Sequence, residues 1–365
     1  MKAAVFRRTL NARFARHGIV GALALVALSS ALGSSPPAFA QASVITDLAR
    51  YSGADRTERL TAGARREGSV TVYTSAAPDD VAALAAAFEK KYGVKVQAWR
   101  SSSENILQRS VIEARGRRFD ADVFETGVIA MESIQRERLL HEINSPALSE
   151  IIPAAIPPHR EWIGTRYNIF SAAYNTGLIK PDEVPKRYED LLDRRWKGKL
   201  GVEAEDSDWF GAVVEQLGEE RGLKLFRDIV AANGISVRKG HTLLASLVVS
   251  GEVSFALDAY AYKLEQLRKS GAPLAWFVMP PGVARFEAVG VARRAAHPHA
   301  GILFFDFMLT DGQEILLQRD FFPASRKGKP APGGVALTFI DAAKGLDENN
   351  KWNRYFRDII INQAR

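Results

Sequence analysis

Residues 67–126 constrain the fold more than any other part of the chain, because two strand–helix units follow each other there and lead into a third strand. Residues 70–73 form a short β-branched and aromatic run, which is typical of a buried strand. Residues 78–80 (Pro-Asp-Asp) begin a helix, and Gly93 is expected to end it. Residues 94–99 form the second expected strand. Strands that alternate with helices predict an α/β fold with a mostly parallel sheet.

Small polar residues follow all three strands, at the edge where parallel strands end. A strand that leads into a helix leaves backbone N–H groups exposed, and these bind small anionic or polar ligands. The candidate ligand-binding residues at this edge are Ser75, Ala76, Ser101, Ser102, Ser103, Glu125 and Thr126. Helix capping by the serines and a solvated position for the glutamate are the alternatives, and the sequence leaves them open.

The first 40 residues have the pattern of a secretory signal peptide. Arginines are frequent in residues 7–16, an apolar stretch at 18–32 is short for a membrane span, and residues 38–40 read Ala-Phe-Ala. We therefore expect cleavage after Ala40 and export to the periplasm. A retained membrane anchor is the alternative, and the choice between the Sec and Tat routes stays open.

The charge balance and the absence of cysteine exclude several classes of function. The chain has 49 Lys and Arg residues against 42 Asp and Glu, and five basic but no acidic residues lie in the first 40. The remainder is nearly neutral, which gives no support to a nucleic-acid partner. No cysteine is present, so disulfides, thiolate metal sites, a cysteine nucleophile and lipidation at the cleavage site are excluded.

A series of motifs resembles, in order and spacing, the periplasmic solute-binding proteins of ABC importers. They are GSVTVYTS (68–75), FEKKYGVKV (88–96), ADVFETG (121–127), NTG (175–177), GEV (251–253), AHPHA (296–300) and FFDFMLTDGQEIL (304–316). The resemblance covers nearly all of the chain after residue 66, and it is closest to the branch that includes ferric-iron and phosphonate binders. It implies a type II fold of two lobes, each a mostly parallel sheet flanked by helices. It also implies a monomer that closes around its cargo and delivers it to an inner-membrane permease.

The expected lobes divide the chain into three parts after the signal peptide. We expect residues 41–168 to form the first part of lobe 1, residues 169–279 to form lobe 2, and residues 280–365 to return to lobe 1 with the C-terminal helices. Residues 169–174 are interpreted as a strand that crosses between the lobes, and residues 280–282 as the return crossing. Two crossings form a hinge, so closure about this hinge is the implied mechanism.

Further candidate ligand-binding residues lie in or beside the expected second lobe. They are Tyr174, Asp206, Ser207, Thr242, Asp258 and Tyr260. Tyr174 ends the crossing strand, and the other positions lie at strand ends or helix starts, where capping is the alternative role. Tyr260 and Tyr262 share a face if the backbone there is extended. None of the six histidines has metal-site spacing, and His241 is the one near a predicted ligand edge.

The sequence leaves two kinds of cargo open. Ferric iron prefers phenolate and carboxylate oxygens, and the resemblance would make Tyr174 and Tyr262 its ligands, with a bound anion completing the set. Ferric members often have His, Tyr or Glu in the loop after the first strand, whereas residues 75–77 here read Ser-Ala-Ala. A phosphonate, phosphate ester or carboxylate would be held by helix N-termini, and Glu125 or Asp258 could pair with an amino group on it.

The function expected from these observations is binding for transport, with no cofactor apart from Fe3+ as cargo. A ligand-binding sensor with the same fold is one alternative, and a secreted hydrolase is another. A hydrolase requires a nucleophile and a base, but the sequence has no Gly-x-Ser-x-Gly, His-Glu-x-x-His or Walker motif. We therefore do not expect an enzyme.

Overall fold

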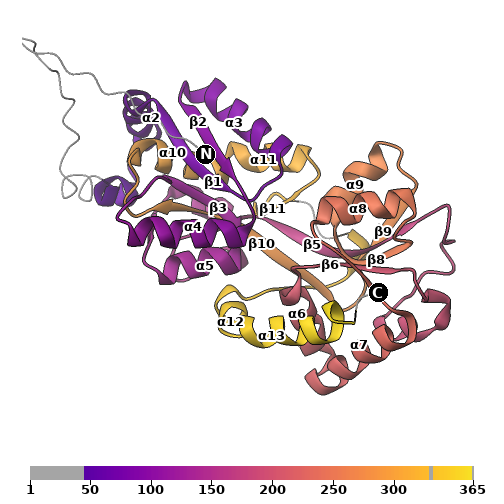
Figure 1. Cartoon of the computed structure of the whole chain (residues 1–365). Coiled ribbons are helices and arrows are strands. Elements are labelled where there is room, and N and C mark those ends of the chain that lie inside the picture. The colour runs from indigo at the N-terminus through magenta and orange to yellow at the C-terminus, as the bar shows by residue number, and fades with distance from the viewer. Residues whose placement is uncertain (1–44, 329–331, 364–365) are drawn as a thin grey trace, which may run out of the picture. The chain divides into compact units, whose positions relative to one another are not determined.

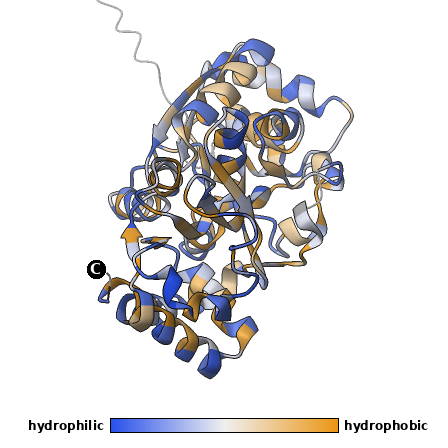
Figure 2. Ribbon diagram, turned by 90° about the vertical axis from the view of Figure 1, so that its right-hand side faces the viewer, coloured by the Kyte–Doolittle hydropathy of each residue, from blue (hydrophilic) through white to orange (hydrophobic). Residues whose placement is uncertain are grey.

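The computed structural model describes residues 45–328 and 332–363, which belong to one compact unit. The predicted signal peptide at residues 1–40 lies outside the described residues. No helix in the described part of the chain is long and apolar enough to cross a membrane. The helices contain both hydrophilic and hydrophobic residues (Figure 2), as expected where one side of a helix packs on a core.

The N-terminal part of this unit confirms the alternation of strands and helices. Its elements are α2 (Arg56–Glu67), β1 (Ser69–Thr74), α3 (Pro78–Tyr92), β2 (Lys95–Arg100), α4 (Ser103–Arg115), β3 (Val123–Gly127), α5 (Val128–Arg136) and β4 (Leu140–His141). Gly93 follows α3 with a φ of 71°, a left-handed conformation that glycine adopts without steric cost. The short 3₁₀ helices η1 (Pro146–Glu150) and η2 (Pro153–Ala155) come next.

The middle of the chain contains the first crossing strand and a second set of strands and helices. The strand β5 (Ile163–Asn175) has 13 residues, all buried, and is longer than the predicted crossing. The elements that follow are η3 (Tyr188–Leu192), η4 (Arg194–Trp196), β6 (Leu200–Glu203), α6 (Ser207–Leu217), α7 (Glu219–Asn233), β7 (Ser236–Arg238), α8 (His241–Ser250), β8 (Phe255–Tyr260), α9 (Ala261–Lys269) and β9 (Leu274–Phe277).

The last part of the chain begins with a second long strand. The strand β10 (Gly282–Ala292) pairs with β5, so this strand, rather than the Pro280-Pro281-Gly282 turn alone, forms the return crossing. The remaining elements are α10 (Pro298–Leu309), α11 (Asp311–Gln318), β11 (Phe322–Pro323), η5 (Pro332–Gly334), β12 (Leu337–Phe339), α12 (Ala342–Asp347), α13 (Asn349–Phe356) and the π-helical η6 (Arg357–Ile361).

All strands join one sheet, in which two parallel sections are connected by antiparallel pairs. The strand order is β2-β1-β3-β10-β5-β8-β6-β7, and β4, β9, β11 and β12 pair at its sides. The pairs among β1, β2 and β3 are parallel, and these strands form the first section. The pairs among β6, β7 and β8 are also parallel, and these strands form the second section. The strands β5 and β10 lie between the two sections (Figure 1) and are antiparallel to each other and to their outer neighbours β8 and β3. The mostly parallel sections agree with the predicted fold class.

Separate hydrophobic clusters lie on the two parallel sections. One contains residues from β1, β3, α3 and α10, and another contains residues from β6, α6, α7 and α13. The C-terminal helix departs from the expected assignment of residues 280–365 to lobe 1. Trp352 of α13 packs against Gly211 of α6, where an added Cβ would lie 2.6 Å from the indole. This part of the chain therefore contributes its apolar side chains to the second section.

Candidate functional site

The carboxyl ends of β1 and β3 bring several of the predicted polar residues together. The Thr126 hydroxyl donates to Ser103 Oγ at 2.8 Å. Ser75 Oγ lies 3.4 Å from Glu287 Oε2, and a Cβ added at Gly127 would lie 3.4 Å from Ser103 Oγ and 3.9 Å from the Glu287 carboxylate. Ser75, Ser103, Thr126 and Glu287 therefore belong to one polar cluster, which we call the serine edge. The two serines are partly exposed, whereas Thr126 and Glu287 are buried.

Two helix N-termini at the serine edge lack a side-chain cap. The helix α3 has Ala77 at its N-cap position and α5 has Gly127, and neither side chain caps the helix. The first N–H groups of α5 remain available for an anion. In α3, however, Pro78 has no N–H, and the Asp80 N–H donates to the Ala77 carbonyl at 3.0 Å. Asp79 and Asp80 also lie in the first turn of α3. By contrast, Ser102 caps α4 by accepting the Asn105 N–H, and Ser101 accepts from the Asn105 side chain. The capping alternative thus describes the contacts of Ser101 and Ser102, while Ser103 faces Thr126.

Glu125 is buried in an ion pair. Its Oε1 lies 2.5 Å from Arg166 Nη1, and the two side chains are 3% and 4% exposed. The Thr74 hydroxyl also donates to this carboxylate, and the Ala76 N–H donates to Thr74 Oγ1 at 3.1 Å. Glu125 and Ala76 therefore contribute to the scaffold beneath the serine edge, instead of offering a free carboxylate or a free N–H group.

The two crossing strands place four polar side chains between the parallel sections. In the register of β5 and β10, Asn168 is opposite Arg285 and Arg166 is opposite Glu287. Asn168 Nδ2 donates to Glu287 Oε1 at 3.0 Å. Burial raises the pKa of Glu287, although Arg166 and Arg285 oppose this shift. None of the four was a predicted site residue, but their two-residue spacing within apolar strands is a signal that could have found them.

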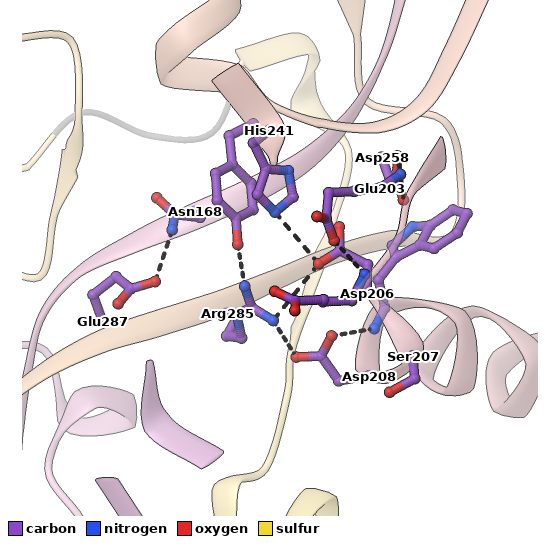
Figure 3. Close-up of polar contacts among 12 residues, drawn as sticks. Asn168, Glu203, Asp206, Ser207, Asp208, His241, Asp258, Arg285 and Glu287 are labelled. Atoms are coloured by element: carbon purple, nitrogen blue, oxygen red, sulfur yellow. Dashed lines mark hydrogen bonds and ion pairs between the residues drawn. The ribbon is translucent and has the colours of Figure 1, made fainter. Parts of the chain in front are cut away.

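A second group of polar residues lies at the ends of β6 and β8 (Figure 3). His241 Nε2 lies 3.4 Å from Asp206 Oδ1. Arg285 Nη1 lies 2.6 Å from Asp208 Oδ2 and 3.8 Å from Asp206 Oδ1, and Arg285 Nη2 donates to the Tyr260 hydroxyl. The residues Glu203, Asp206, Asp208, Asp258 and His241 are called the acidic group below.

Hydrogen bonds and burial fix the acidic group. Glu203 Oε1 accepts the Gly240 N–H at 2.7 Å, and the Asp258 carboxylate accepts the Glu203 N–H at 3.0 and 3.1 Å. Burial raises the pKa values of Glu203, Asp206 and Asp258, and it lowers the pKa of His241 to about 3. His241 therefore carries no charge at neutral pH.

The predicted tyrosines separate into two places. Tyr260 stacks on His241 with ring centroids 3.4 Å apart, and its centroid is 6.1 Å from that of Tyr262. Tyr174, however, is opposite Phe255 at the start of β8, whereas Tyr260 at the end of that strand is opposite Phe170. Tyr174 lies in the second hydrophobic cluster and is not brought to the acidic group.

Two other predicted residues make their hydrogen bonds outside the acidic group. The Ser207 hydroxyl donates to Asn353 Oδ1 at 2.6 Å, and so connects α6 to α13. Thr242 is exposed, and its carbonyl accepts from the Ser246 hydroxyl. Of the predicted second-lobe residues, the structure thus gathers Asp206, Asp258 and Tyr260.

Comparison with known proteins shows the family and the fold. Residues 119–347 match the model of a family described as bacterial extracellular solute-binding proteins. The chain is 26% identical over 290 residues to "Iron uptake protein A1" of Synechocystis sp., an alignment that covers 73% of this chain and 78% of the relative. These matches confirm the resemblance seen in the motifs.

Solved structures confirm the type II periplasmic-binding-protein fold. Iron-bound HitA from Pseudomonas aeruginosa superposes with a TM-score of 0.68 at 22% identity, covering 80% of this chain and 99% of HitA. AfuA from Actinobacillus pleuropneumoniae, with exogenous fructose-6-phosphate bound, superposes with a TM-score of 0.71 at 21% identity, covering 81% and 99%. The cargoes named in these two structures differ.

Proposed function

Because the chain belongs to the bacterial extracellular solute-binding protein family, we propose that it is the periplasmic binding component of an ABC importer whose cargo is an organic phosphate ester or phosphonate. Cleavage after Ala40, function as a monomer and docking on an inner-membrane permease are parts of this proposal. Closure about β5 and β10 would capture the cargo. A sensor with the same fold would bind the same cargo, and genes for a permease and an ATPase beside this one would favour transport.

The serine edge is the observation that carries the choice of cargo. Ser75 and Ser103 are partly exposed and offer hydroxyls beside the uncapped N-terminus of α5, and this combination suits a phosphate or phosphonate group. Thr126 is buried and donates to Ser103, so it positions that serine. Glu287 lies at this edge beside Ser75 and accepts a hydrogen bond from Asn168, and burial raises the pKa of its carboxyl.

The acidic group supports a cargo that carries hydroxyl or amino groups at its other end. Carboxylates accept hydrogen bonds from such groups, whereas they repel a phosphate. The N-terminus of α6 begins at Asp206, which is 1% exposed, so an anion is disfavoured there. The hydrogen bonds from Ser75 through Glu287 end at Asn168. Arg285 is opposite Asn168 in the register of β5 and β10, and its contacts reach the acidic group. One small molecule could place an anionic end at the serine edge and a polar end at the acidic group.

Ferric iron is the second candidate, because Tyr260 and Tyr262 lie close together and a related uptake protein is named for iron. Two phenolates and an anion on the serine edge would provide hard oxygen ligands. The Tyr260 hydroxyl, however, is paired with Arg285, and Tyr262 stacks on Phe321 with centroids 4.0 Å apart. Iron at Tyr260 would therefore lie beside the Arg285 guanidinium, and the positive charge of that guanidinium disfavours a second cation there.

Calorimetric titration of the mature protein, refolded to remove its cargo, tests the choice. We expect fructose 6-phosphate to bind and Ser103→Ala to weaken its affinity about tenfold, because a hydrogen bond to a charged group contributes about 1.5–3 kcal/mol. Ser270→Ala, which changes the exposed serine that follows α9, is the matched control. Failure to bind this ester or a phosphonate, together with a visible tyrosinate band after addition of ferric citrate, would replace this cargo by iron.

A further inference from the structure

Three members of the acidic group have the geometry of a metal site. One carboxylate oxygen from each of Glu203 and Asp206 and one ring nitrogen of His241 all lie within 4.8 Å of one another. Glu203 ends β6, Asp206 precedes α6 and His241 begins α8, and Figure 3 shows the Asp206 and His241 side chains directed toward each other. A single ion at the centre of these atoms would connect three elements of the second section.

Unsatisfied polar atoms point to a missing partner at this place. The Asp206 side chain is 2% exposed, and its Oδ2 has no hydrogen-bond partner in the described part of the chain. His241 turns its Nε2 toward this carboxylate at 3.4 Å, and its Nδ1, on the other side of the ring, is buried without a partner among the described residues. Buried polar atoms are normally paired, because an unpaired one loses its hydration without compensation. A bound cation would use the free oxygen directly.

The charges also require compensation. Arg285 lies 2.6 Å from Asp208 but 3.8 Å from Asp206, so Asp208 holds its guanidinium to one side. Glu203, Asp206 and Asp258 are 2%, 1% and 0% exposed, and an uncompensated buried carboxylate is costly.

We propose that Glu203, Asp206 and His241 bind one divalent first-row transition-metal ion. Two carboxylate oxygens and a neutral imidazole nitrogen form a donor set that suits such an ion. Asp258 supports the site from behind, since it holds the Glu203 backbone N–H and so fixes the end of β6. The ion is a resident of the protein and not its cargo. With three protein ligands it keeps an open coordination position, so this ion, and not the three side chains themselves, would face the hydroxyl or amino end of the proposed cargo.

Titration of the EDTA-treated mature protein with Co2+ and Zn2+ tests the site. We expect one ion per chain, absorption bands of Co2+ with nitrogen and oxygen ligands, and a higher melting temperature with Zn2+, because a ligand that binds the native state stabilises it. His241→Gln and Asp206→Asn should each weaken binding at least tenfold. His299→Gln, in which the histidine bonded to Glu67 in the first section is changed, should bind as the wild type does.

Several results would overturn the metal site. They are no Co2+ binding, equal binding by the wild type and His241→Gln, or a loss of binding in Tyr262→Phe that leaves His241→Gln unaffected. Circular dichroism in EDTA establishes that each variant is folded. Binding of fructose 6-phosphate is measured separately in EDTA, so failure of the proposed cargo and failure of the metal site are distinguished.

Discussion

Replacement of Arg166 by methionine should destabilise the protein strongly, because it breaks a buried ion pair. Arg166 and Glu125 are 4% and 3% exposed at a distance of 2.5 Å, and the guanidinium carbon lies 5.1 Å from the Phe321 ring centroid. In the variant, the Glu125 carboxylate keeps the Thr74 hydroxyl but has no cation beside it. Removal of one partner of a buried pair costs about 3–5 kcal/mol.

A double variant separates the charge effect from the loss of packing. Glu125→Gln combined with Arg166→Met removes both charges, so it should lose less free energy of unfolding than the two single variants lose together. We expect a coupling of about 2 kcal/mol or more, within the range for residues in one network. Urea unfolding followed by tryptophan fluorescence provides the values. A loss below about 1 kcal/mol for Arg166→Met, or strict additivity in the double variant, would refute this reasoning.

Two further predictions concern the first section. His297 Nδ1 lies 2.8 Å from Asp122 Oδ2, and this hydrogen bond raises the pKa of His297 above 6.5. The folded state thus binds this proton more tightly than the unfolded state, so the contribution to stability is complete below pH 6.5 and is lost as the pH rises through the folded pKa. Melting temperatures between pH 6 and 8.5 should fall more steeply in the wild type than in His297→Gln, and parallel curves would contradict this. Phe88→Ala should cost about 3–5 kcal/mol, because Phe88 is 0% exposed and packs with Phe304 at a centroid distance of 5.1 Å. The control Leu243→Ala, at a side chain 47% exposed, should change stability by about 0.5 kcal/mol or less, and equal losses in the two variants would disprove the packing argument.

Much of the secondary structure and part of the candidate site follow from local sequence signals. Pro78 begins α3, Gly93 ends it and Ser102 caps α4, because these effects depend on neighbouring residues in the chain. Ser103 and Thr126 were also predicted at one sheet edge, and their hydroxyls are hydrogen-bonded. That contact follows from parallel strands, whose carboxyl ends lie on the same edge.

The sequence by itself determined the α/β class, the family and the positions where strands lead into helices, because periodicity, caps and motifs are local properties. Only the tertiary structure decided which side chains meet. The register of β5 and β10 sets Arg285 opposite Asn168 and places Tyr174 at the far end of its pairing with β8, and a shift of one residue would turn each side chain to the other face. In the same way, Asp206 and His241 meet only because α6 and α8 begin at the same edge of the sheet, a contact that depends on long-range pairing.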